Sequence, residues 1–158
     1  MIFTGTYKHA VDVKSRLAIP SKIRSQIQRS EGQQAGQALT LVMTLGEDGC
    51  LCLYTESGFE QRAKELDAST LDHDELLAYE RLFFSSAETA EIDKQGRVRL
   101  PESLLSRTEL GSDVVLLGVK DHLEVHDRQT WLVHVEQQLK NNPSITMNPR
   151  RAMRKSES

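Results

Sequence analysis

The pattern of apolar and polar positions predicts one strand–turn–strand unit that occurs twice, with equivalent residues 81 positions apart. In the first copy, the extended residues Thr6–Val13 reach a polar turn and return as Leu17–Ile19, with alternate apolar side chains pointing inward. The second copy comprises Glu88–Lys94 and returns as Val98–Leu100. A proline ends each returning strand, where it suits the first turn of a short helix.

Each unit is predicted to continue with a two-stranded hairpin and a longer helix. In the first half, Leu39–Leu45 and Cys50–Tyr54 flank the turn GEDG. In the second half, Asp113–Val119 and His122–His126 flank a turn around Lys120. The expected helices are Ser21–Arg29, Glu56–Leu66, Glu102–Arg107 and Arg128–Lys140.

The repeat also predicts how the chain is organised. We expect a first repeat over residues 1–68, a linking helix over 69–86, a second repeat over 87–140 and a flexible basic tail over 141–158. The linking segment has leucines at helical spacing and an acidic outer face.

The charges are unevenly distributed although the net charge is only −3. Residues 1–40 carry six basic and two acidic side chains, and residues 141–158 carry four basic and one acidic. A locally basic surface on an acidic protein indicates an anionic partner that meets one face. The tail arginines either add non-specific attraction to such a partner or belong to a solvated end.

The cysteines and the apolar runs indicate the compartment. Cys50 and Cys52 are too close in sequence to close a useful disulfide loop, which favours a reducing, cytoplasmic setting. The chain does not begin like a signal peptide, and no apolar run approaches the roughly 20 residues that span a bilayer.

A D-x-x-x-R motif lies on the turn of each unit, as Asp12 and Arg16 and again as Asp93 and Arg97. An arginine just past a tight turn presents a planar fork of donors that suits phosphate oxygens and guanine edges. The aspartate can hold that arginine or bond the turn amides. A single copy would most simply brace its turn, but two copies with basic neighbours favour binding to an anion. These neighbours are Lys8, Lys14, Lys22, Arg24, Lys94 and Arg99.

The two spaced motifs, GTYKHAVDVKSRLAIPSKIR and EIDKQGRVRLP, closely resemble those of the MraZ family of bacterial transcriptional regulators, which is grouped with AbrB-like swapped-hairpin DNA-binding proteins. The resemblance covers roughly residues 1–140. It implies an α+β fold in which two pseudo-symmetric repeats interlace into one small β-barrel with peripheral helices.

The resemblance also implies a function. Family members form rings of many subunits, bind direct repeats in the promoter of the division and cell-wall gene cluster, and associate with the nucleoid. Their D-x-x-x-R signature for DNA contact falls here on Asp12, Arg16, Asp93 and Arg97. We therefore expect a sequence-specific, cytoplasmic DNA-binding regulator. Its candidate DNA contacts are Asp12, Lys14, Arg16, Asp93, Lys94, Arg97 and Arg99, with supporting phosphate contacts from Lys8, Lys22 and Arg24.

The chain departs from the family pattern at Ser15, where a glycine is usual, as Gly96 is in the second copy. Serine is less well tolerated than glycine where a turn requires positive φ. This predicts a somewhat different shape for the first turn and makes Arg97 the firmer candidate contact.

Other candidate chemistry is weaker. The segment HLEVH alternates as a strand, which places His122 and His126 together on an outer face without further ligands at suitable spacing. We therefore expect no metal site there, and we expect Cys50 and Cys52 to be ordinary strand residues. No nucleophile elbow, P-loop or dinucleotide glycine pattern occurs, so the sequence predicts no enzyme and no cofactor.

Two rival interpretations remain open. In the first, the chain forms a structural or protein-partner ring in which the basic turns meet acidic faces of neighbouring subunits. In the second, it is a small hydrolase or metal enzyme, which would require tightly bound metal.

Overall fold

The computed structural model describes residues 1–144, which divide between two compact units. The first unit comprises residues 1–128, and the second begins at residue 129. Most of the predicted basic tail lies outside the described residues. The predicted repeat boundaries remain a prediction.

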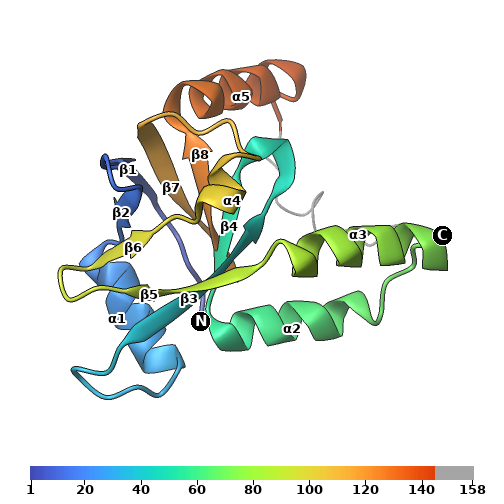
Figure 1. The fold of residues 1–158 in the computed structure, drawn as a ribbon. Helices are drawn as coiled ribbons and strands as arrows, with labels where there is room; N and C mark the ends of the chain where they lie inside the picture. Colours follow the sequence, from blue (N-terminus) through green and yellow to red (C-terminus); the bar gives the residue numbers. More distant parts are fainter. Residues whose placement is uncertain (145–158) are drawn as a thin grey trace. The chain divides into compact units, whose positions relative to one another are not determined.

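Eight antiparallel strands of the first unit form one nearly closed β-barrel (Figure 1). Their order is β1-β7-β8-β4-β3-β5-β6-β2. All eight predicted strands are present, with ends that shift by a few residues at most. The bounds are β1 Thr6–Ala10, β2 Arg16–Ala18, β3 Leu39–Leu45, β4 Leu51–Tyr54, β5 Glu88–Ile92, β6 Arg97–Arg99, β7 Asp113–Val119 and β8 His122–Asp127.

The two sequence halves are interlaced through their strand pairing. β1 pairs with β7 and β5 pairs with β3, so equivalent strands make equivalent pairs across the halves. β2 pairs with β6, its own copy, and Leu17 faces its equivalent Val98. β4 pairs with β8 in the same way, with Cys52 opposite Glu124, 72 residues further along the chain. A pseudo-twofold axis therefore passes through both pairs, and the expected α+β fold with an interlaced barrel is confirmed.

The helices follow the predicted positions closely. Pro20 and Pro101 precede the short helices, as expected for residues that end a strand and favour a first turn. The Thr55 hydroxyl and the Asp72 carboxylate accept backbone N–H bonds at the starts of the next two helices. The bounds in the first unit are α1 Ser21–Ser30, η1 Glu47–Gly49, α2 Glu56–Leu66, α3 His73–Ser85 and α4 Glu102–Leu105.

Two apolar clusters stabilise the first unit. The larger one fills the barrel with alternate strand residues and with Ile23 and Ile27 of α1. The smaller one lies between the outside of β3 and β4 and the aromatic residues of α2 and α3. In it, Phe59 of α2 stacks on Phe83 of α3 at 5.6 Å between ring centroids, and the two helices run side by side in Figure 1.

The second unit is described by α5, which spans Arg128–Asn141. Within it, Trp131 stacks on His134 with 5.5 Å between ring centroids. Over the part of the chain that the structure describes, no helix is both long and apolar enough to cross a membrane.

Candidate nucleic-acid interface

The first D-x-x-x-R turn connects β1 to β2 and is held by one carboxylate. Asp12 Oδ1 accepts the backbone N–H groups of Lys14 and Arg16, both at 2.9 Å. Asp12 Oδ2 accepts the Nε–H of Arg16 at 2.7 Å. The carboxylate thus shapes the turn and orients the guanidinium, while the Nε contact uses only one of its five N–H donors.

The second turn, between β5 and β6, repeats this network. Asp93 Oδ1 accepts the backbone N–H groups of Gln95 and Arg97, again at 2.9 Å, and Oδ2 accepts Arg97 Nε–H at 3.2 Å. In both halves, one aspartate carboxylate therefore does two things: it stabilises the turn and it orients the arginine side chain.

The expected difference in shape between the two turns is wrong. Ser15 adopts φ 59° and Gly96 adopts φ 81°, both in the left-handed region. In each turn this residue donates its backbone N–H to the backbone carbonyl of the motif aspartate three positions earlier, Asp12 or Asp93, at 2.9 Å in both cases. The carboxylate bonds of the turn hold Ser15 in a conformation that glycine adopts more easily.

The two turns also bind to each other. Ile19 N–H donates to the Gly96 carbonyl and Leu100 N–H donates to the Ser15 carbonyl, both at 2.8 Å. Each turn therefore closes over the end of the other returning strand. The spacing between the two arginines is fixed by backbone bonds rather than by flexible loops.

One face of the β2–β6 pair carries three arginines. Arg16 lies opposite Arg99, and Ala18 lies opposite Arg97. Leu17 and Val98 between them are fully buried, so the alternation of strand side chains places the arginines on the outer face. Diagonal neighbours on such a pair have Cα atoms about 7–8 Å apart, which applies to Arg16 and Arg97.

The other predicted DNA contacts lie on the two turns, on α1 and on β1 rather than on the β2–β6 pair. Lys14 and Lys94 are exposed on the two turns, and Lys22 is exposed in the first turn of α1. Arg24 donates from Nε to the Ile19 carbonyl at 3.0 Å, and its guanidinium covers Gly96. Lys8 is exposed on β1 opposite Val115, outside the β2–β6 pair.

Val13 was not among the predicted contacts, although it is fully exposed at the tip of the first turn. The equivalent position of the second turn is Lys94, and Lys14 corresponds to Gln95. Aligning the two motifs could have revealed this difference, because an apolar residue follows the aspartate in the first motif and a lysine follows it in the second. The two turns thus share a backbone but present different tips.

The turn networks change the acidity of both aspartates. The backbone N–H bond from Arg16 is the largest influence that lowers the pKa of Asp12, and the bond from Arg97 does the same for Asp93. Both carboxylates therefore remain ionised well into the acidic range.

The expectation that His122 and His126 bind no metal stays a prediction, but its premise, that further potential ligands are lacking, does not hold in the folded chain. His122 and His126 share one face of β8, but they are only 9 % and 8 % exposed. Further potential ligands do lie close by, because Cys52 of β4 and Cys50, the residue just before β4, lie beside Glu124. Sequence spacing within one strand could not reveal ligands supplied by its partner strand.

The sequence of the chain also matches a known protein family. Residues 2–79 and 83–155 match the sequence model of the family described as "MraZ protein, putative antitoxin-like". The two matched segments fall on the two halves of the chain.

Individual relatives cover most of the chain. A transcriptional regulator MraZ of Ligilactobacillus salivarius is 33 % identical over 147 residues, which is 93 % of this chain and 96 % of that protein. Proteins of the same name from Finegoldia magna and Mycoplasmoides gallisepticum are 35 % and 36 % identical, over 82 % and 80 % of this chain and 84 % and 82 % of their own lengths. The chain belongs to the MraZ family.

Proposed function

We propose that this chain is a transcriptional regulator that binds DNA through the outer face of β2 and β6. Relatives that match most of the chain are named transcriptional regulators, which supports a role in transcription. The finer steps of the proposal are direct DNA contact, recognition of promoter direct repeats of the division and cell-wall gene cluster, and action as a ring oligomer associated with the nucleoid.

The observation that carries the proposal is the pair of equivalent turns that fix Arg16 and Arg97 on one rigid face. A guanidinium held through Nε keeps its remaining donors available for a guanine edge or a phosphate. Preorganisation by an aspartate and by backbone bonds reduces the entropy lost on binding.

The size of the β2–β6 pair supports insertion into the major groove. The groove of B-DNA is about 12 Å wide and admits a two-stranded β-ribbon. With Cα atoms about 7–8 Å apart, Arg16 and Arg97 reach base edges within one groove. The exposed lysines of the turns and of α1 then neutralise the flanking phosphates and set the register.

The unlike turn tips give this face a direction on DNA. Val13 suits an apolar contact such as a thymine methyl group, whereas Lys94 suits a phosphate or a guanine. A pseudo-symmetric subunit that reads its two half-sites differently is matched to direct repeats, in which each subunit meets the same sequence in the same orientation. Tethering of several subunits in a ring would raise the effective concentration for each later contact.

The site assignment is tested by replacing each motif arginine in turn. Arg16→Ala and Arg97→Ala should each weaken binding to a fluorescent fragment of the upstream promoter by about tenfold or more. Arg81→Ala is the matched control, because it removes the same charge from an exposed position on α3 and should leave the affinity within about twofold.

Size-exclusion chromatography and thermal unfolding should show the same oligomer and stability for all variants. If both motif variants bind promoter DNA as tightly as Arg81→Ala does, the assignment of the contact face is wrong.

A further inference from the structure

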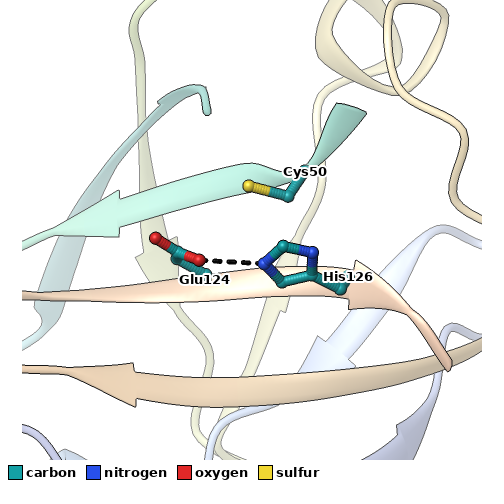
Figure 2. Close-up of side chains that lie close together, drawn as sticks. All are labelled: Cys50, Glu124 and His126. Carbon is teal, nitrogen blue, oxygen red and sulfur yellow. Dashed lines mark hydrogen bonds and ion pairs between the residues drawn. The ribbon is translucent and has the colours of Figure 1, made fainter. Parts of the chain in front are cut away.

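Five potential metal-binding side chains gather on the outer face of the β4–β8 pair. By strand order this pair lies halfway round the barrel from β2 and β6. Figure 2 shows three of these residues, with Cys50 on one chain segment of the pair and Glu124 and His126 on the neighbouring strand. The five are Cys50, Cys52, His122, Glu124 and His126.

The strand register explains why they meet. Cys52 lies opposite Glu124, and extending the register by one residue on each side places Cys50 opposite His126 and Tyr54 opposite His122. The stacking of Tyr54 on His122, at 5.2 Å between centroids, agrees with this register. Alternate residues of a strand share one face, so the cluster is a direct product of pairing between the two halves.

Gly46 makes room for both sulfur atoms. A Cβ on Gly46 would lie 2.5 Å from Cys50 Sγ and 2.7 Å from Cys52 Sγ, which no side chain could accommodate without movement. The two thiols lie against the same point of the backbone. The end of β3 thus forms a floor beneath the thiols.

Glu124 is shared by two groups of potential ligands. Its Oε1 lies 2.8 Å from His126 Nε2, and its Oε2 lies 2.8 Å from His122 Nε2. Cys50, Glu124 and His126 offer ligand atoms that all lie within 4.8 Å of one another, and so do Cys52, His122 and Glu124. Zinc bond lengths of about 2.0–2.3 Å place tetrahedral ligands roughly 3.3–3.7 Å apart, so either group needs movements of only about 1 Å.

The positive charge of Arg62 distinguishes the two groups. Arg62 binds Asp121 at 3.0 Å and lies over the Tyr54 ring, and Asp121 in turn contacts His122 Nδ1 at 2.7 Å. The His122 end therefore already has a cation and a complete ion-pair network. A divalent ion there would be repelled by the guanidinium.

We propose that Cys50, Glu124 and His126 bind one divalent transition-metal ion of the zinc class. Thiolate, imidazole and carboxylate together suit zinc, and two anionic ligands neutralise its charge. Cys50 and His126 are more than nine-tenths buried, which shields the bonds from water. The Glu124 side chain is 23 % exposed and provides the route of entry.

Acidity favours Cys50 as a ligand and disfavours His126. Burial lowers the pKa of His126, but its hydrogen bonds with Cys50 and Glu124 outweigh burial and raise that pKa to about 9, so a metal ion must displace a proton from the imidazole. The hydrogen bond from Cys52, opposed by burial and aided by His126, lowers the pKa of Cys50 to about 6, whereas the same bond and burial raise the pKa of Cys52. The direction of these pKa shifts agrees with the choice of Cys50 as the ligand, which rests on the position of Arg62 at the other group. Coordination would release the proton that His126 carries and leave its imidazole neutral.

The test uses the untagged full-length chain, first stripped of metal with a chelator. One equivalent of Zn²⁺ should remain bound after desalting and raise Tm, whereas Mg²⁺ should do neither. One equivalent of Co²⁺ should produce a thiolate-to-cobalt charge-transfer band in the near ultraviolet. Absence of the band and of retained zinc would overturn the proposal.

Variants locate the site. Cys50→Ser and His126→Gln should each weaken Co²⁺ binding more than about tenfold. The matched control Cys52→Ser lies two residues further along the chain and keeps a hydroxyl that can still donate to Cys50, so it should keep the charge-transfer band and an affinity within a fewfold of the unmodified chain. Equal loss in both serine variants, or loss in Cys52→Ser alone, would overturn this choice of ligands.

Two further Co²⁺ titrations cover a variant that fails to fold and separate the metal proposal from the DNA proposal. If Cys50→Ser does not fold, the Co²⁺ titration of the unmodified chain and of Cys52→Ser still decides the question. Arg16→Ala, on the opposite side of the barrel, should bind Co²⁺ like the unmodified chain whether or not it binds DNA, so the two proposals fail independently.

Discussion

At the residue scale, the left-handed position of each turn is what lets a short D-x-x-x-R segment present its arginine. Gly96 adopts this conformation without a Cβ, and its open side is covered by the Arg24 guanidinium. Ser15 adopts it with a side chain, at a cost that the Asp12 bonds offset. The same backbone is therefore reached from two different residue types.

The turn glycine gives a stability prediction. Gly96→Ala should destabilise the fold by about 1–2 kcal/mol, because alanine is strained at φ 81° and its Cβ would lie 2.7 Å from Arg24 Cζ. Ser15→Ala is the matched control, since residue 15 already carries a Cβ, and it should change the free energy of unfolding by only a few tenths of a kcal/mol. Urea denaturation measures both, and an equal cost in the two variants would contradict the strain argument.

The two motif aspartates give a pH prediction. Their pKa values in the fold lie below the ordinary 3.8, so their stabilising contribution is complete above that pH and is lost as the pH falls through the lowered values. Carboxyl carbon NMR shifts should titrate with midpoints below 3.8 for both Asp12 and Asp93. Midpoints at or above 3.8 would show that the turn bonds are not formed in solution.

At the element scale, a buried hydrogen bond attaches helix α3 to the barrel together with the aromatic residues of the helix. The Thr44 hydroxyl of β3 donates to the Phe83 carbonyl at 2.6 Å, and Thr44 is fully buried. The end of α3 is therefore fixed where the chain enters the second half.

Removing that hydroxyl should be costly. Thr44→Val keeps the shape but leaves the Phe83 carbonyl without its donor, which should lower the free energy of unfolding by about 1–3 kcal/mol. Thr40→Val is the control on the same strand, because its hydroxyl bonds Glu56 at the exposed surface, and it should cost less than about 0.5 kcal/mol. Similar costs in chemical denaturation would argue against a special role for the buried bond.

The elements also show how far sequence reasoning reaches. Alternation and turn residues located every strand, and the two prolines located the short helices, because these signals are local. Pairing between β4 and β8 is not local, so the contact of Cys50 with His126 escaped a strand-by-strand reading. The repeat offset of 72 residues could have predicted this pairing, because a pseudo-twofold axis can place a strand next to its own equivalent, as it does for β4 and β8.

The candidate DNA face was predictable for a similar reason. Asp12, Arg16, Asp93 and Arg97 belong to local turns with recognisable spacing, and the structure gives them equivalent bonds. The shape of the Ser15 turn was predicted wrongly, because intrinsic preference was given more weight than the aspartate bonds that override it. The exposure of Val13 depends on where the strand ends, which a periodic pattern locates only to within a few residues.

At the scale of the whole molecule, one pseudo-twofold axis relates the two sequence halves and passes through both proposed sites. It passes between Leu17 and Val98 beneath the arginine face and between Cys52 and Glu124 at the proposed metal site. The two halves carry nearly the same turn residues at the β2–β6 pair, whereas at the β4–β8 pair one half supplies cysteines and the other supplies histidines and a glutamate. DNA binding and metal binding would then be separable properties of a single barrel.

The central claim is that the basic face contacts DNA, and the salt dependence of promoter binding tests it most directly. Affinity for a promoter fragment with its direct repeats should fall steeply as salt rises, with a slope of about −0.9 per phosphate contacted, and should exceed that for a scrambled fragment. A protein-partner ring whose basic turns meet acidic subunit faces predicts otherwise. Negligible binding at low salt, unchanged as salt increases, would contradict the account.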